Sequence, residues 1–328
     1  MSGGGVLIVR RQPGDYNCPM RVVFMGSPGF AVPALHCLVQ EGFEVAAVYT
    51  KQDKPSGRGR ALGSSPVKRE AAALGLTIVQ PKSLRSPETQ QELAALRPEV
   101  IVVCAYGQIL PKVVLEMPRY GCLNIHPSLL PRHRGASPVA STILSGDAWG
   151  GTSVMQMDEG LDTGPVLTRA PVLVRDDDTA GSLSSRLSIV SAHLLIDVLP
   201  RWVKGEIKPR PQDGSQATYF KPVAKEAGEI DWRLGALEIW RRVRALQPWP
   251  GAYTRFQGKL LKILEARPLT CEPRGAPGLV IALGKGFGIA TGEGALEVLR
   301  VQIEGKQAVS GEEFARGQRS FIGTVLPS

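Results

Sequence analysis

The chain of 328 residues is 43% hydrophobic and 21% charged, which is typical of a globular protein with one large or two smaller domains. Its net charge of +9 indicates a polyanionic partner such as nucleic acid or a phosphorylated substrate, although many basic proteins bind neither. The five cysteines are scattered without a C-x-x-C pair and no apolar run reaches about 18 residues, so we expect no disulfide framework, zinc knuckle or transmembrane helix.

Residues 1–19 precede the first strand-like run, and their apolar core is too short for a signal peptide. Met20 stands directly before that run. We therefore expect residues 1–19 to be a disordered extension outside the fold, or to reflect a start codon placed too early.

Short apolar runs alternate with helical patterns over residues 20–205. The strand-like runs cover 21–26, 44–50, 77–80, 99–106, 121–126 and 152–157, and the helical patterns cover 28–41, 66–75, 87–96 and 179–203. Such alternation is typical of βαβ units, and continuous apolar strands fit a sheet that is covered on both faces. The sequence therefore predicts an α/β domain with a Rossmann-like, mostly parallel sheet.

A basic loop follows the second predicted strand. Residues 51–69 carry a net charge of +5, from Lys51, Lys54, Arg58, Arg60, Lys68 and Arg69 against Asp53. Flexible basic loops grip phosphates when they lie near an active site. On composition alone, a solvated surface loop explains the same residues.

Asn124 and His126 stand at the end of a strand-like run, in the stretch NIHPSLLPRHRGASP. Residues two apart in a strand point to the same face, so the amide and the imidazole can both donate to a developing oxyanion. A glycine-rich stretch, MDEGLDTGP, places the acids Asp158, Glu159 and Asp162 further along the chain. These acids can orient the imidazole, or they can simply shape a turn.

The composition changes after residue 205. Residues 206–223 are rich in proline and polar residues and predict a linker. A helical pattern then lies within 229–246, and short strands follow at 252–256, 259–266, 278–283, 286–290 and 295–301. Short strands separated by glycine turns predict a smaller C-terminal β-barrel of OB-like type in residues 224–328.

The stretches NIHPSLLPRHRGASP and MDEGLDTG together resemble the signature of the 10-formyltetrahydrofolate-dependent formyltransferases. The resemblance implies a catalytic trio of Asn124, His126 and Asp162, with 10-formyltetrahydrofolate as the formyl donor and no metal. It also implies that folate is contacted by the S-L-L-P turn, formed by Ser128, Leu129, Leu130 and Pro131.

Within this family the sequence is most similar to the members that formylate methionyl initiator tRNA, from Met20 to the C-terminus. The similarity rests on MGSPGFAVPAL, TKQDKPSGRGRALGSSPVK and IDW with ALQPWPGAYT. It implies a tRNA-binding barrel in residues 224–328, and a basic loop that meets the acceptor stem through Lys51, Lys54, Arg58 and Arg60. We expect a monomeric transferase of translation initiation and one-carbon metabolism in the cytoplasm, without membrane attachment.

Four other functions compete with this interpretation. The acceptor can be a sugar nucleotide or a purine precursor, or water in a formyltetrahydrofolate hydrolase; the basic loop and the C-terminal domain argue against these. A dinucleotide-dependent oxidoreductase also suits a parallel sheet, but MGSPGF lacks the G-x-G-x-x-G pattern. A non-catalytic RNA-binding protein would not need the trio.

Overall fold

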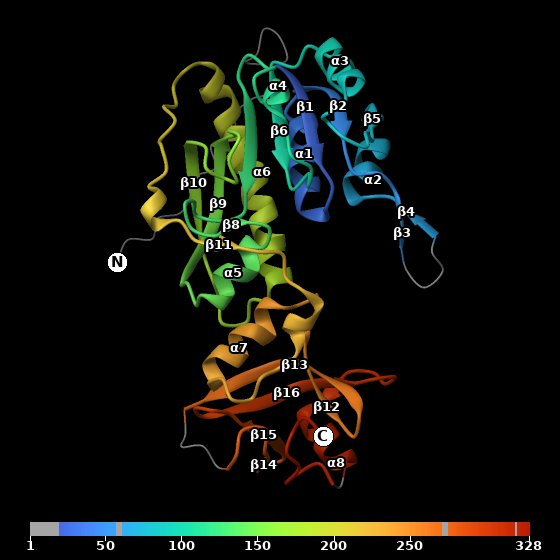
Figure 1. Ribbon diagram of the computed structural model, residues 1–328, viewed down its shortest axis with the longest axis vertical. Coiled ribbons are helices and arrows are strands. Elements are labelled where there is room, and N and C mark those ends of the chain that lie inside the picture. The colour runs from blue at the N-terminus through green and yellow to red at the C-terminus, as the bar shows by residue number, and fades with distance from the viewer. Residues whose placement is uncertain (1–19, 57–60, 271–274, 319) are drawn as a thin grey trace.

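The computed structural model describes residues 20–56, 61–270, 275–318 and 320–328. The expected extension 1–19 and the basic residues Arg58 and Arg60 lie outside this part of the chain. Two folded units with separate hydrophobic cores follow one another along the long axis of the molecule (Figure 1).

The N-terminal unit is built on a seven-stranded sheet in the order β10-β9-β7-β6-β1-β2-β5. Its strands are β1 (Arg21–Gly26), β2 (Glu44–Tyr49), β5 (Ile78–Val79), β6 (Val100–Cys104), β7 (Cys122–His126), β9 (Trp149–Gln156) and β10 (Val166–Leu173). Strands β5, β2, β1, β6 and β7 pair in parallel, whereas β9 and β10 are antiparallel to their neighbours. The predicted Rossmann-like, mostly parallel sheet is therefore confirmed.

Strand β10 was not predicted from the sequence. Its residues alternate between partly exposed and exposed positions after the first two, and Pro171 interrupts the run. A solvated edge strand gives a weak hydrophobic signal, and proline is tolerated there because an edge has unpaired N–H positions.

Helices cover both faces of this sheet. On one face α1 (Val32–Gln40), α2 (Pro66–Ala73) and α6 (Ala180–Val203) share a core with the strands, and on the other α3 (Pro87–Ala95) and α4 (Lys112–Leu115) do so. Helix α6 is long and apolar enough to span a membrane by composition alone, but nine of its residues are buried within the protein.

Smaller elements surround the sheet at the ends of its strands. A 3-10 turn, η1 (Gly29–Ala31), leads into α1, and the hairpin of β3 (Lys54–Ser56) and β4 (Ala61–Gly63) stands off the domain (Figure 1). The short strand β8 (Arg134–Gly135) and α5 (Pro138–Leu144) follow β7.

The segment that joins the two units lies along the N-terminal one. It contains η2 (Gly214–Gln216), the short strand β11 (Tyr219–Phe220) and η3 (Lys225–Gly228). Strand β11 pairs in parallel with β8.

The C-terminal unit is an antiparallel sheet of six strands in the order β12-β13-β16-β15-β14, with β17 beside β16. Its elements are α7 (Ala236–Ala245), β12 (Ala252–Phe256), β13 (Lys259–Leu269), β14 (Val280–Leu283), β15 (Gly286–Ala290), β16 (Ala295–Ile303), β17 (Val309–Ser310) and α8 (Gly311–Gly317). The strands enclose one aromatic core, in which Phe321 meets Phe256, Phe287 and Phe314 with ring centroids 4.8–4.9 Å apart. The smaller C-terminal β domain predicted from the sequence is present as this antiparallel sheet, with α7 and α8 packed against its strands.

Helix α7 joins the two units by packing against α5. Arg244 on α7 is 8% exposed and donates to the carbonyl oxygens of Asp178 and Arg175 at 2.9 and 2.6 Å. Its guanidinium also lies 4.2 Å from the ring centroid of Trp240. Arg244 therefore holds the two units together, and it is not free to bind an external phosphate.

Candidate active site

Strand β7 presents Asn124 and His126 on one face of the sheet, because side chains two residues apart in a strand point the same way. The loop between β9 and β10 brings Asp162 to that face. Oδ1 of Asp162 lies 3.5 Å from Nδ2 of Asn124 and 3.7 Å from Nδ1 of His126. The three residues that the sequence predicted as catalytic therefore converge on one point. Because the side chain of His126 is only 5% exposed, charges at this point interact more strongly than they do in water.

The Asp162 carboxylate is held from its other side. Oδ2 of Asp162 accepts a hydrogen bond from the backbone N–H of Gly135 at 2.8 Å. Gly135 has φ +104°, and a Cβ at this position would lie 2.4 Å from the carbonyl oxygen of Phe220. Only glycine therefore allows this backbone to approach both the carboxylate and β11.

His126 is oriented by a backbone carbonyl. Nε2 of His126 lies 3.0 Å from the carbonyl oxygen of His133. Because a carbonyl oxygen can only accept, Nε2 carries a hydrogen and Nδ1 is the nitrogen that faces Asp162. When Nδ1 carries a hydrogen, it can point that hydrogen toward the Asp162 carboxylate.

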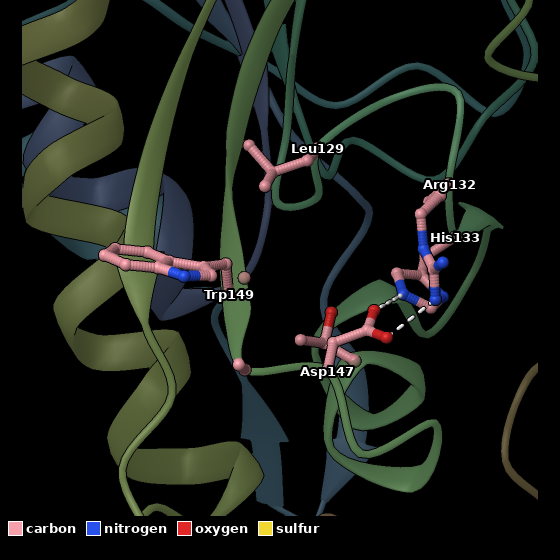
Figure 2. Close-up of a pocket in the computed structure, with 8 residues that line it drawn as sticks. Leu129, Arg132, His133, Asp147 and Trp149 are labelled. Atoms are coloured by element: carbon pink, nitrogen blue, oxygen red, sulfur yellow. Dashed lines mark hydrogen bonds and ion pairs between the residues drawn. The ribbon is translucent and has the colours of Figure 1, made fainter.

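The carbonyl group belongs to a second histidine, His133, whose own ring is held in place by hydrogen bonding. The side chain of His133 is 3% exposed, and its Nε2 lies 2.7 Å from Oδ2 of Asp147. Oδ1 of the same carboxylate accepts from Arg132 at 2.6 Å, as Figure 2 shows. Burial lowers the pKa of His133, and the hydrogen bond to Asp147 offsets only part of this effect. His133 is therefore a neutral anchor in the loop.

The loop around His133 also borders a cavity of about 240 Å³. Leu129, Trp149 and Gly150 line it together with the Arg132, His133 and Asp147 cluster (Figure 2). The indole of Trp149 is largely exposed. The cavity lies beyond the carboxyl end of β7, where ligands bind in sheets of this kind.

The S-L-L-P turn presents only part of itself to a ligand. Ser128 and Leu130 are buried, and Oγ of Ser128 donates to the carbonyl oxygen of Arg132 at 2.6 Å. Leu129 and Pro131 keep partly exposed side chains. Of the four residues predicted to contact folate, these two can offer their side chains to a ligand.

A larger cavity of about 640 Å³ borders the loop that carries Asp162. Met157, Asp158 and Gly160 of this loop line it, with Leu115 of α4 and with Lys112. The cavity thus combines an apolar wall with charged side chains of both signs.

The basic loop is described only in part. Lys51 is exposed and Lys54 begins β3, whereas Arg58 and Arg60 lie outside the described residues. Nζ of Lys68 bonds Oδ2 of Asp53 at 2.5 Å, so Lys68 does not contribute a free cation. In the described part of the chain, no group of three or more His, Cys, Asp or Glu is arranged to hold a metal.

Three residues that shape this site were not predicted from the sequence. The first is His133, whose carbonyl oxygen accepts the hydrogen bond that orients His126. The others are Thr218, whose Oγ1 accepts from the N–H of His133 at 2.8 Å, and Gln212, whose amide nitrogen donates to the Asp162 loop. Both lie in the segment predicted as a linker. No spacing pattern in the sequence connects them with Asn124 and Asp162.

The chain matches the family model described as formyl transferase over residues 20–199. It also matches the model described as formyl transferase, C-terminal domain, over residues 222–319. Together the two models cover most of the chain.

Individual proteins agree with the family models. A protein of Dehalococcoides mccartyi named methionyl-tRNA formyltransferase is 49% identical over 308 residues, covering 94% of this chain and 98% of that one. A protein of the same name from Hydrogenovibrio crunogenus is 44% identical over 309 residues, covering 94% and 99%. The solved N-formyltransferase of Helicobacter canadensis, in complex with folinic acid and dTDP-3-aminofucose, has a TM-score of 0.64 at 18% identity, covering 85% of this chain and 98% of that one. This last likeness shows the shared fold.

We predict that His133 makes stability depend on pH. Its pKa is lowered in the folded protein, so it stabilises the fold above its unfolded pKa of about 6.5, and this contribution is lost as the pH falls through the folded pKa. In urea unfolding between pH 7.5 and 5, the unfolding free energy of wild type should fall more steeply than that of His133→Phe, by at most about 1.4 kcal/mol per pH unit. Exposed His193→Phe is the control. Parallel profiles for wild type and His133→Phe would contradict the assignment.

Proposed function

The chain belongs to the formyl transferase family, and we propose that Asn124, His126 and Asp162 perform its chemistry. Its relatives named methionyl-tRNA formyltransferase match it over almost their whole length. The enzyme accordingly transfers a formyl group to the amino group of methionyl initiator tRNA, a step of translation initiation. The observation that carries the chemical proposal is the convergence of an amide, an imidazole and a carboxylate on one face of β7.

The reaction begins when the methionine amine attacks the formyl carbon of the donor. A C–N bond forms, and the formyl oxygen becomes an oxyanion. Nδ2 of Asn124 and the protonated Nδ1 of His126 donate hydrogen bonds to this oxygen, exchanging their long contacts with Asp162 for shorter ones. Because both donors are fixed before the substrate arrives, little reorganisation opposes the reaction.

Asp162 has two roles in this scheme, one electrostatic and one in proton transfer. Its carboxylate compensates the imidazolium of His126 and accepts the proton that the attacking amine releases, directly or through water. When the tetrahedral intermediate collapses, the bond between the formyl carbon and N10 of the folate breaks. The released proton passes to N10, so the products are formyl-methionyl-tRNA and tetrahydrofolate. The amine must be neutral to attack, and the rate therefore falls at low pH.

The donor we propose is 10-formyltetrahydrofolate. N10 lies between the pteridine ring and the aminobenzoyl-glutamate, so a bound donor extends to both sides of the trio. The partly exposed Leu129 and Pro131 lie at one end of β7, and the cavity of about 640 Å³ lies at the other. This cavity offers Leu115 and Met157 to a flat ring.

For the acceptor, we propose that the basic loop and the C-terminal unit hold the tRNA. The loop brings Lys51, Lys54, Arg58 and Arg60 to the phosphates, and residues 224–328 form the tRNA-binding domain, joined by residues 206–223. We further propose that the enzyme acts as a monomer in the cytoplasm, where translation is initiated.

Other acceptors are not favoured. The N-formyltransferase in complex with an amino sugar nucleotide is only 18% identical, and that likeness carries the fold alone. A formyltetrahydrofolate hydrolase needs no second domain to hold an acceptor. The tRNA acceptor accounts for the C-terminal unit and for the net charge of +9.

Single replacements of the trio test the chemistry. Asn124→Ala and His126→Ala should each lower kcat about 10²–10³-fold, which is the usual cost of losing one oxyanion donor, and Asp162→Asn should lower it at least as far. Transfer of labelled formyl from 10-formyltetrahydrofolate to methionyl initiator tRNA measures this. Exposed His193→Ala on α6 is the matched control. If His126→Ala kept near-wild-type transfer, the proposed mechanism would lose its centre.

Two variants test the proposed binding residues of the two substrates separately. Arg58→Ala should raise KM for the tRNA about tenfold and leave KM for the donor unchanged, because a phosphate contact serves only the tRNA. Leu129→Ser should raise KM for the donor alone. The Arg58→Ala effect should shrink as salt rises, since screening weakens phosphate contacts. Equal changes in both KM values for either variant would refute the assignment of that residue.

A further inference from the structure

The segment between the two units is bonded to both loops of the active site. Arg210 exchanges two backbone hydrogen bonds with Val166, at 2.8 and 2.9 Å, just after the Asp162 loop. Thr218 accepts from the N–H groups of His133 and Arg134, both at 2.8 Å, through its hydroxyl and its carbonyl oxygen. The segment therefore bridges the loop that orients His126 and the loop that carries Asp162.

Gln212 is the side chain that completes this bridge. Its Nε2 donates to the carbonyl oxygens of Asp162 and Gly164, at 2.8 and 2.7 Å. Its Oε1 accepts from Nε and Nη2 of Arg134, at 3.2 and 2.9 Å. Both amide hydrogens and the amide oxygen are thus used, and one side chain ties the two catalytic loops together.

The partner of Gln212 is an unusual arginine. Arg134 is 4% exposed, yet within the described residues no carboxylate lies within ion-pair distance of it. Besides Gln212, its side chain donates to the hydroxyl of Tyr219 at 2.7 Å. A buried guanidinium that lacks a counter-ion depends on its neutral acceptors, and both of these come from the connecting segment.

The backbone of Asp162 needs external support. Its φ of +55° is in the left-handed region, which costs energy for a residue with a side chain. Gly164, two residues on, is packed so closely that a Cβ would lie 1.9 Å from the carbonyl oxygen of Gln156. The two hydrogen bonds from Gln212 fall on the carbonyl groups of these two residues, where they oppose relaxation of the loop.

We infer that Gln212 is a positioning residue for formyl transfer, which holds the Asp162 carboxylate against Asn124 and His126 by clamping the backbone of its loop to Arg134. The inference rests on the proposed function of the trio. The connecting segment is then part of the active site of the N-terminal unit as well as the tether of the C-terminal unit.

Gln212→Ala and Gln212→Glu test the clamp. The first removes all four hydrogen bonds, whereas the second keeps an acceptor for Arg134 but loses both donors to the loop. Both should lower kcat for transfer to methionyl initiator tRNA about 10–100-fold, with KM for each substrate within about twofold, because misplacing a catalytic group slows the chemical step. The pH profile of kcat should also change, since the Asp162 carboxylate would no longer lie beside Nδ1 of His126.

Gln216→Ala is the matched control. Gln216 is an exposed glutamine of the same segment, and among the described residues its side chain bonds Asp213 alone. Its kcat and its pH profile should stay at the wild-type values. Thermal unfolding of each variant shows whether the fold is kept.

The outcomes separate the two proposals. If wild type transfers formyl and Gln212→Ala keeps its kcat within about threefold, or if Gln216→Ala loses as much, the clamp is refuted and the trio stands. If wild type gives no transfer, the proposed function itself fails. If Gln212→Ala does not fold, Tyr219→Phe tests the clamp instead. This variant removes only the hydroxyl that accepts from Arg134, and the fold should tolerate it because Tyr219 is largely exposed. Its kcat should fall about threefold to tenfold with the fold kept, and an unchanged kcat would refute the clamp.

Discussion

The hydrogen bond from Nε2 of His126 to the carbonyl oxygen of His133 is the constraint on which the site depends. This bond fixes the plane of the imidazole and occupies Nε2. Nδ1 is therefore the ring nitrogen that faces Asp162 and is available to the substrate. The carbonyl can accept this bond because His133 has φ +60° and its own ring is anchored to Asp147. Burial lowers the pKa of His133, which favours the neutral form of this anchor.

The remaining architecture keeps the partners of His126 in place. The parallel sheet supplies β7 as a rigid base, with helices packed on both of its faces. The two loops that follow β7 and β9 are joined by the segment leading to the C-terminal unit, through β11, Thr218 and Gln212. An enzyme that moves a formyl group between two large substrates needs such pre-organisation, because its reacting atoms must meet within a few tenths of an ångström.

Much of the fold, and part of the site, can be predicted from the sequence. Apolar runs and their spacing identify the central strands, and the two-residue period of a strand places Asn124 beside His126. Asp162 follows from a resemblance to known sequences, since no spacing rule brings it to β7. Gln212 and Thr218 escape prediction because they act through backbone groups 48 to 85 residues away. Arg244 is one of several arginines on α7, and its charge alone does not reveal that it is buried against the loop that precedes α6.

The central claim is that His126 turns Nδ1 toward the substrate, and nitrogen-15 NMR of the histidine side chains tests it most directly. The chain has only four histidines, so the His126 signals can be assigned by comparison with His126→Ala. The account predicts that Nε2 of His126 keeps its hydrogen at every pH at which the fold persists, so that the neutral ring is the Nε2–H tautomer. A neutral ring with its hydrogen on Nδ1 would contradict the account, because Nε2 would then face the His133 carbonyl without a proton.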